Sequence, residues 1–269
     1  MADKLRILVT NDDGIRAEGL KIAEAIARSL SDDVWVVAPE SEQSGASHSL
    51  TLTMPLRLRK IGERRFAITG TPTDCVMMAL THLMKDSPPT LLLSGVNRGI
   101  NAADDVTYSG TIAGAMEGCT LGIPSVALSQ TYDYENRSEI PWDCAAAHGP
   151  ELVKRLVEAG WPKDVLMNIN FPDCPPGDVA GVEVVAQGAR EVQEATIDGR
   201  IDMRGNPYFW IGFRREKFVA KQGTDLGALS LNKISVTPLQ LNLTDWKVLQ
   251  ALKPSIDAVF MPPAKEPTP

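Results

Sequence analysis

One stretch near the start of the chain, Leu5 to Gly14, most constrains the fold. It is a short run of apolar β-forming residues that ends in Asn11, Asp12 and Asp13. Such a run predicts a buried strand that carries polar groups at its carboxyl end, the edge where open α/β sheets place their active sites. Because neighbouring residues of a strand point to opposite faces, both aspartates can face one ion only if the backbone turns, and Gly14 permits that turn.

The aspartate pair has two interpretations at this stage. Two neighbouring carboxylates repel each other when both are ionised, and in a dehydrated pocket one stays protonated unless a cation lies between them. Hard oxygen ligands of this kind favour Mg²⁺, Mn²⁺ or Ca²⁺. The alternative is a plain turn in which an aspartate caps the next helix. Other segments of the chain must decide between a metal site and a cap.

Length and charge narrow the class of protein. The 269 residues, 43% of them hydrophobic, suffice for one large α/β domain with a sizeable core. The formal net charge is −7 and no long block of lysines and arginines is present, so the sequence does not indicate a nucleic-acid polymer as partner. The first residues lack the pattern of a signal peptide, and no apolar stretch approaches membrane-spanning length. We therefore expect a cytoplasmic protein without a membrane partner.

The cysteines predict neither a zinc site nor a disulfide framework. Cys75, Cys119, Cys144 and Cys174 are widely spaced, with no C-x-x-C pair and no adjacent histidine. In a reducing cytoplasm such residues are by default free, mostly buried thiols.

The order of the expected elements predicts a Rossmann-like, doubly wound and mostly parallel sheet. Helical spacing over Glu18 to Leu30 follows the first strand, and Val34 to Ala38 is the second strand. This β-α-β start implies a right-handed crossover. Further strands are expected at 91–94, 124–129 and 165–170, and helices are expected to start after Thr71 and Ser109 and to cover 144–159. The carboxyl ends of these strands should share one edge of the sheet.

Three segments at that edge carry polar side chains. The loop that follows the second strand holds three hydroxyls, and its residues alone do not choose among Ser41, Ser44 and Ser47. Asn97, after the third strand, can offer a carbonyl oxygen to a metal but cannot attack a substrate as a serine nucleophile does. Ser109 opens a helix whose backbone N–H groups could hold a phosphate, although plain capping of that helix explains it equally well.

Two regions depart from the parallel pattern. The period-two alternation of 50–54, 55–59 and 65–69 predicts an antiparallel excursion. Beyond Pro172, short alternating strands up to Phe213, one more strand at 234–238 and a short helix at 244–252 suggest a β-rich extension. We divide the chain into an α/β core over 1–172, an extension over 173–260 that belongs to the same structural domain and closes over the edge or pairs with another subunit, and a Pro-rich, disordered tail over 261–269.

These segments should converge at the carboxyl edge of the sheet. Carboxylates and neutral oxygens suited to a hard cation would then lie beside a helix amino end suited to an anion. This combination predicts a metal-dependent phosphoryl-transfer site.

The sequence resembles the SurE survival-protein phosphatases, also called stationary-phase 5′-nucleotidases. The shared motifs occur in the family's order from Ile7 to about Pro238: Val-Thr-Asn-Asp-Asp-Gly14, Val-Ala-Pro39, Gly-Thr-Pro72 with Asp74-Cys-Val, Ser-Gly-Val-Asn-Arg-Gly99, Tyr-Ser-Gly-Thr111, Glu-Gly118 and Ser-Val-Thr-Pro238. The sequence departs from the family pattern at Ala102-Ala103, where many relatives carry a glycine beside the aspartate.

The resemblance implies an activity and a set of site residues. It implies one Mg²⁺ or Mn²⁺ ion per subunit, held by Asp12, Asp13, Ser44 and Asn97, and a substrate phosphate near Asn11, Asn101, Ser109, Gly110 and Thr111. The implied reaction is release of phosphate from nucleoside 5′-monophosphates, with 3′-nucleotides and short polyphosphate left open, in a homodimer or homotetramer built partly by exchanged carboxyl-terminal elements.

For the mechanism we expect Asp12, Asp13 and Asn11 to be the catalytic residues, with one aspartate assisting deprotonation of an attacking water. An aspartyl-phosphate is less favoured, because a metal-bound carboxylate is a poor nucleophile.

Two alternative functions, from other classes of protein, would use some of the same residues. A signalling receiver also places an acidic pair after its first strand, but it needs an aspartate after the third strand, where this chain has Asn97. A nucleotide-binding sensor without catalysis would keep the same residues, and only turnover separates it from an enzyme.

Overall fold

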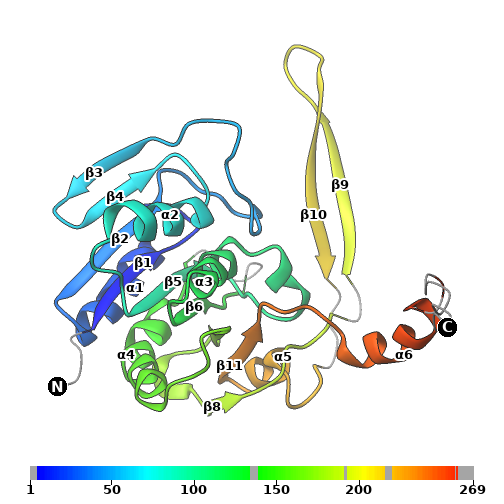
Figure 1. Cartoon of the computed structure of the whole chain (residues 1–269). Coiled ribbons are helices and arrows are strands. Elements are labelled where there is room, and N and C mark those ends of the chain that lie inside the picture. The colour runs from blue at the N-terminus through cyan, green and yellow to red at the C-terminus, as the bar shows by residue number, and fades with distance from the viewer. Residues whose placement is uncertain (1–4, 134–138, 191–192, 216–219, 258, 260–269) are drawn as a thin grey trace, which may run out of the picture. The chain divides into compact units, whose positions relative to one another are not determined.

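The computed structural model of the chain describes residues 5–133, 139–190, 193–215, 220–257 and 259 (Figure 1). Among these residues, nine strands form one large sheet in the order β3-β4-β2-β1-β5-β6-β7-β11-β8. They are β1 (Arg6–Thr10), β2 (Asp33–Pro39), β3 (Leu58–Gly62), β4 (Arg65–Ile68), β5 (Leu91–Arg98), β6 (Ser125–Gln130), β7 (Val165–Phe171), β8 (Gly181–Val184) and β11 (Lys233–Gln240). Strands β2, β1, β5, β6 and β7 pair in parallel, so the predicted doubly wound α/β fold is confirmed.

The sheet is wound in both directions from β1. β2 lies on one side of β1 and β5 on the other, so the strand order reverses between β1 and β5. At such a switch point the connections leave towards opposite faces of the sheet and open a crevice at the carboxyl ends of the strands. Asp12 and Asp13 follow β1 directly, and Asn97 lies near the end of β5. The two polar segments expected to meet are therefore on adjacent strands at the switch point.

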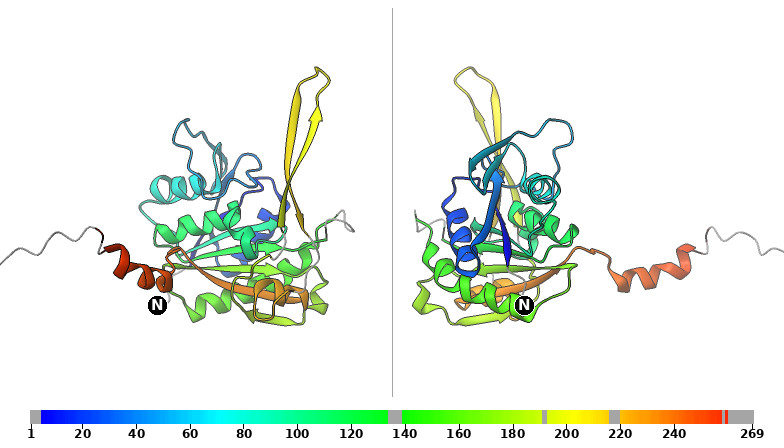
Figure 2. Two further views of the ribbon diagram at one scale, coloured as in Figure 1. Left: turned by 90° about the vertical axis from the view of Figure 1, so that its right-hand side faces the viewer. Right: turned by 60° about the vertical axis from the view of Figure 1, so that its left-hand side comes forward.

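Helices cover both faces of this sheet. The helices of the described residues are α1 (Glu18–Leu30), α2 (Pro72–Met78), α3 (Gly110–Thr120), α4 (Trp142–Ala159), α5 (Asp225–Ser230) and, in a separate unit of the chain, α6 (Trp246–Asp257), with short helical turns at Ala79–Leu83, Ala103–Thr107 and Pro176–Asp178. α1 and α4 pack on one face, and α2 and α3 on the other (Figure 2). The apolar spacing that predicted α1 is the buried side of that helix, where Leu20, Ala23 and Ile26 join the core. The predicted bounds of α1 are confirmed.

The amino end of α2 is capped as its sequence predicts. The Thr71 hydroxyl accepts a hydrogen bond from the Asp74 N–H at 3.2 Å, and the Asp74 carboxylate accepts one from the Thr71 N–H at 2.8 Å. Pro72 occupies the first turn, where its missing N–H leaves no bond unmade. This reciprocal arrangement satisfies two backbone donors that the helix itself cannot satisfy.

The antiparallel excursion is shorter than predicted. β3 pairs antiparallel with β4, which in turn pairs in parallel with β2. Residues 50–57, by contrast, form an irregular loop, and Leu52 and Met54 are 85% and 68% exposed. The expectation of a strand at 50–54 was wrong, because the alternation there does not reflect burial of one face, and the strand expected at 55–59 is present only from Leu58 onwards. Thr51 instead fastens this loop, donating through its N–H and its hydroxyl to Asp74 at 3.0 and 2.6 Å.

The carboxyl-terminal half supplies both sheet strands and a separate ribbon. β8 and β11 pair in parallel and extend the sheet beyond β7. β9 (Gln193–Ile201) and β10 (Pro207–Arg215) pair antiparallel with each other and form the long hairpin seen in Figure 1. The predicted short strands before Phe213 are therefore present, and so is the strand at 234–238.

The chain divides into two compact units, residues 1–239 and 240–269. Helix α6 belongs to the second unit, where a helix was predicted, and the tail expected over 261–269 lies outside the described residues. Within the part of the chain that the structure describes, no helix combines the length and the apolar character needed to cross a bilayer.

The cysteine thiols should be inert in the folded protein. All four cysteines are buried, and Cys75, Cys119 and Cys144 are free thiols. Burial raises the pKa of Cys75 well above its ordinary value and raises the pKa of Cys144 to about 12, so these groups stay protonated at pH 8. We expect no reaction of the native protein with a disulfide reagent at pH 8, and full reaction after unfolding in guanidinium. Rapid reaction of a native thiol would contradict this burial.

Candidate active site

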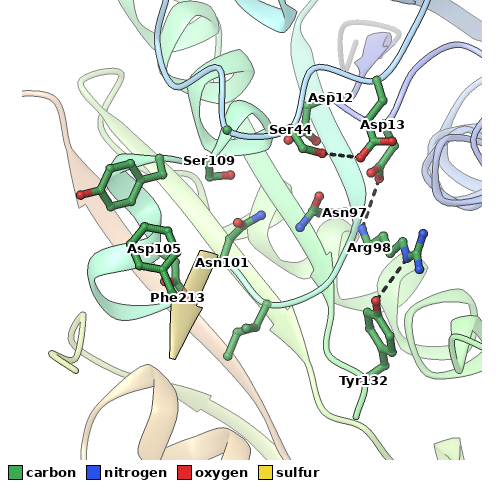
Figure 3. Close-up of a pocket in the computed structure, with 14 residues that line it drawn as sticks. Asp12, Asp13, Ser44, Asn97, Arg98, Asn101, Asp105, Ser109, Tyr132 and Phe213 are labelled. Atoms are coloured by element: carbon green, nitrogen blue, oxygen red, sulfur yellow. Dashed lines mark hydrogen bonds between the residues drawn. The ribbon is translucent and has the colours of Figure 1, made fainter. Parts of the chain in front are cut away.

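A polar pocket of about 460 Å³ opens at the carboxyl edge of the sheet, over the switch point between β1 and β5 (Figure 3). Its walls come from the loops that follow β1, β2, β5 and β6, from the start of α3 and from the end of β10. The lining residues are Asp12, Asp13, Glu42, Ser44, Gly45, Asn97, Arg98, Ile100, Asn101, Asp105, Tyr108, Ser109, Tyr132 and Phe213. Segments far apart in the sequence thus meet at the edge where the sequence predicts a site.

Asp12 is held deep in this pocket by the start of α3. Its side chain accepts a hydrogen bond of 2.6 Å from the Thr111 hydroxyl and another from the Thr111 N–H, and the residue is only 4% exposed. A Cβ atom at position 110 would lie 2.8 Å from the Asp12 Cβ, so only glycine lets the helix come this close. Burial raises the pKa of the Asp12 carboxyl, and the hydrogen bonds from Thr111 oppose that shift.

Asp13 is the more accessible of the two carboxylates. Its Oδ2 accepts a hydrogen bond of 3.2 Å from the Arg98 N–H at the end of β5. Burial, and then the neighbouring charge of Asp12, raise the pKa of Asp13 to about 6. Glu42 acts in the same direction on both aspartates. The pocket therefore concentrates negative charge at one end, and the positive charge of Arg98 offsets it only in part.

The loop after β2 brings one of its three serines to the pocket. The Gln43 N–H donates to the Asp12 carbonyl at 2.8 Å, which fastens the loop over the end of β1. Ser44 lines the pocket, and its hydroxyl donates to Glu42 at 2.9 Å. Ser47 points elsewhere and donates to the Thr107 carbonyl at 2.7 Å. The residues of the loop alone did not choose among Ser41, Ser44 and Ser47. Their positions in the fold do, because only Ser44 lines the pocket.

The two asparagines are oriented by neighbouring backbone and amide groups. The Asn97 amide N–H donates to the Gly99 carbonyl at 2.9 Å, which leaves its carbonyl oxygen on the side of the two aspartates (Figure 3). The Asn101 backbone N–H donates to Asn170 at 2.9 Å, and its carbonyl accepts from Asn168 at 2.7 Å. The Asn101 side-chain amide donates to Ser129 at 2.9 Å. Side chains of β6 and β7 thus fix the loop that carries Asn101.

Three of the expected site residues lie behind the pocket wall. Gly110 and Thr111 support Asp12, as described above, and their side chains do not line the pocket. Asn11 is fully buried and donates to the Gly14 carbonyl at 3.1 Å, while its own carbonyl oxygen has no hydrogen-bond partner. Ser109 does line the pocket, and its hydroxyl caps α3 by accepting from the Ile112 N–H at 3.1 Å. The first turn of α3 therefore serves Asp12 as well as the pocket.

Sequence reasoning missed several lining residues. Glu42 and Arg98 each lie within two residues of a predicted ligand, so their place in the loop could have indicated them. Tyr132 follows β6, and the Arg98 guanidinium turns towards its ring, donating to its hydroxyl at 3.2 Å. Phe213 comes from the end of β10, 81 residues after Tyr132, the lining residue that precedes it in the sequence. No local pattern in the sequence could place it there.

The donor set fits a hard divalent cation. In the described part of the chain no three His, Cys, Asp or Glu side chains are grouped to hold a metal. An ion at this site would therefore take two carboxylates, Asp12 and Asp13, and neutral oxygens from Ser44 and Asn97. Oxygen ligands of this kind suit Mg²⁺ or Mn²⁺, and a dication would offset the burial and the neighbouring negative charge that together raise both pKa values.

Fold and site together define a class: a doubly wound α/β protein with an oxygen-lined, acidic pocket at the topological switch point. Residues 7–194 match the family model described as Survival protein SurE. The chain therefore belongs to the SurE family, and the resemblance seen in the sequence motifs is confirmed.

Similar proteins cover nearly the whole chain. A protein of Methylorubrum extorquens named 5′-nucleotidase SurE is 61% identical over 241 residues, which are 90% of this chain and 95% of that protein. A protein of the same name from Parvibaculum lavamentivorans is 54% identical over 258 residues, 96% of this chain and 93% of that one. The crystal structure of the SurE protein from Aquifex aeolicus has a TM-score of 0.80 at 38% identity and covers 92% of this chain and 98% of that chain.

In the loop that follows Asn101, replacement of Ala103 by glycine should cost little stability, whereas replacement of Ala102 should cost more. Ala103 has a left-handed backbone with φ of 53°, whereas Ala102 is extended with φ of −132°. We expect Ala103→Gly to change the free energy of unfolding by less than about 1 kcal/mol, because relief of strain offsets the lost methyl group and the added chain entropy.

Ala102→Gly is the matched control for this change. It removes an equally buried methyl group without relieving strain, so it should destabilise the protein by about 1 kcal/mol more than Ala103→Gly. Urea unfolding of both variants measures the difference. Equal losses in the two variants would contradict the strained conformation at Ala103.

Proposed function

We propose that this chain is a divalent-metal-dependent phosphatase that releases phosphate from nucleoside 5′-monophosphates. The observation that carries the proposal is a pair of carboxylates, the buried Asp12 and the half-buried Asp13, beside neutral oxygens in one pocket. Close relatives over nearly the full chain are named 5′-nucleotidases, which supports the same reaction. Asp12, Asp13, Ser44 and Asn97 would hold the ion, which when bound supplies Lewis-acid polarisation of a phosphoryl oxygen and neutralises developing charge.

The other parts of the proposed reaction are assigned to side chains of the protein. Asp13 is the more exposed carboxylate, and we assign to it the role of accepting a proton from the attacking water as the water oxygen bonds to phosphorus and the P–O ester bond breaks; the nucleoside oxygen leaves as a hydroxyl by taking up a proton from solvent. Asp12 is committed to Thr111 and serves as a fixed ligand. Ser109 and Asn101 face the same pocket and would donate to the phosphoryl oxygens. Asn11, by holding the Gly14 carbonyl, is a positioning residue for the turn that separates the two aspartates.

Phosphate release should depend on the metal and on Asp12. We would assay nucleoside 5′- and 3′-monophosphates and a short polyphosphate with Mg²⁺, with Mn²⁺ and with EDTA. Wild-type protein should release phosphate with a metal and none with EDTA, and Asp12→Asn should lose at least about a hundredfold in rate, because one charged ligand is lost at a buried site.

Asp164→Asn is the control for this variant. Asp164 is exposed and precedes β7 at the opposite edge of the sheet, so its loss should leave the rate unchanged. Tight nucleotide binding without phosphate release under any metal would overturn the enzyme and leave a non-catalytic sensor.

We also propose that the chain forms a homodimer or homotetramer through its hairpin and through α6. Among the described strands, β9 and β10 pair only with each other, and Ile197, Phe209, Trp210 and Ile211 are 61–78% exposed. A two-stranded ribbon is marginal by itself, and exposed apolar side chains in this number mark association surfaces. Considered separately, α6 exposes Trp246, Leu249, Leu252 and Ile256, which recur at helical spacing.

A charge placed on the hairpin should disrupt this assembly. We expect wild-type protein to sediment at a multiple of the monomer mass and Trp210→Glu to shift towards the monomer, because an ionised carboxylate is costly to bury in an apolar interface. Lys221→Glu, an exposed change outside the hairpin, should sediment as the wild type does. A monomeric wild-type protein at micromolar concentration would contradict the proposal.

A further inference from the structure

One end of the pocket is aromatic and has no role in the chemistry described so far. Tyr108 and Phe213 both line the pocket, and their ring centroids lie 5.9 Å apart with the planes inclined at 40°. Figure 3 shows Phe213 across the pocket from Asp13, with Asn97 and Asn101 between them. The pocket therefore has a carboxylate end and an aromatic end.

The two rings are accessible to a ligand. Tyr108 is 54% exposed and Phe213 is 45% exposed, so neither ring is a core residue. Aromatic faces that remain open to water inside a concave polar pocket are typical of sites that take up a flat ligand. The exposed area of both rings therefore indicates a ligand that would cover them.

Tyr108 is held firmly by its own backbone. Its N–H donates to the Asp105 carbonyl at 3.0 Å, and its carbonyl accepts from the Ser47 N–H at 3.3 Å. The Asp105 carboxylate forms an ion pair of 2.6 Å with Arg190, and both of these side chains are about nine-tenths buried. The Asp105 carboxylate is thus engaged by an arginine, and the Tyr108 ring remains as a recognition surface.

Phe213 reaches the same place from the other direction. It lies near the end of β10, where the hairpin meets the pocket, while Arg190 lies shortly before β9 starts. Phe213 therefore contacts Tyr108, while Arg190, which precedes the hairpin, contacts Asp105 in the turn Ala103–Thr107 just before Tyr108. This arrangement fixes both rings relative to α3, whose first turn supports Asp12.

We propose that Tyr108 and Phe213 form the nucleobase-binding face of this pocket. The inference rests on the proposed function for its phosphate end, and it adds the groups that recognise the rest of the substrate. A volume of about 460 Å³ lies within the range of sites for small organic ligands. Stacking accepts any base, because every base has a π-face, and it favours purines through their larger area. The site selects nucleotides over small phosphate esters by this contact.

The test separates base recognition from phosphate chemistry. Adenosine, which carries no phosphate, is titrated calorimetrically into metal-free protein, and kcat/KM is measured for AMP and for glycerol 2-phosphate in the metal-loaded enzyme. Phe213→Ala should weaken adenosine binding about tenfold and lower the preference for AMP over glycerol 2-phosphate by a similar factor. Phe213→Trp should retain both properties, and Tyr108→Phe should retain stacking without the hydroxyl.

Leu231→Ala is the control for an exposed apolar side chain lost outside the pocket and outside the hairpin. Leu231 is 53% exposed, follows α5 and does not line the pocket, so its loss should change neither adenosine affinity nor the AMP preference.

Each other outcome has a fixed meaning. The proposal is overturned if wild-type protein does not bind adenosine, if Phe213→Ala binds it as well as wild type, or if the variant loses activity equally on both esters. If wild-type protein hydrolyses neither ester but binds adenosine through Phe213, the phosphatase fails and the nucleobase site stands.

Discussion

The hydrogen bonds between Thr111 and Asp12 are the interaction on which the site depends. They join the end of β1 to the first turn of α3, two elements that are separated by almost a hundred residues of chain. Gly110 makes them possible, because a side chain at that position would occupy the place of the aspartate. A helix amino end is a favourable electrostatic environment for an anion, and here it could have been used for a substrate anion alone. In this protein it also stabilises a buried carboxylate of the chain itself, that of Asp12.

The hydrogen bonds from Thr111 hold the Asp12 carboxylate in a buried position, where a folded protein does not usually place a negative charge. Asp12 is buried, Asp13 is next to it, and Glu42 lies in the same pocket, so in the absence of a cation the site opposes ionisation of its own carboxylates. Buried groups with perturbed pKa values are typical of functional sites, since selection for stability alone would remove them. The buried amide groups of Asn168 and Asn170 serve a related purpose, since they fix the Asn101 loop with hydrogen bonds rather than with apolar packing.

The sequence predicts the parts of this structure that depend on local order. The helix over Glu18 to Leu30, the capping of α2 by Thr71 and the strands of the parallel sheet follow from periodicity and end signals, which are read over a few residues. The strand predicted at 50–54 is absent, because alternation was taken for burial where the side chains face water. Ser44 could not be told from Ser41 by chemistry, and Phe213 could not be placed at all, because both depend on which loops the fold brings to one edge.

The turn at Ala103–Thr107 has a further consequence. It is held from outside by Arg190 through Asp105, by Asp225 through the Ala103 N–H at 2.8 Å, and by Gln187 through the Ala103 carbonyl at 2.9 Å. These three contacts come from the segments that flank the hairpin, so they link the hairpin to the turn beside the pocket. A subunit that displaced the hairpin would therefore also displace Tyr108 and the first turn of α3. Subunit assembly and catalytic rate would then depend on each other.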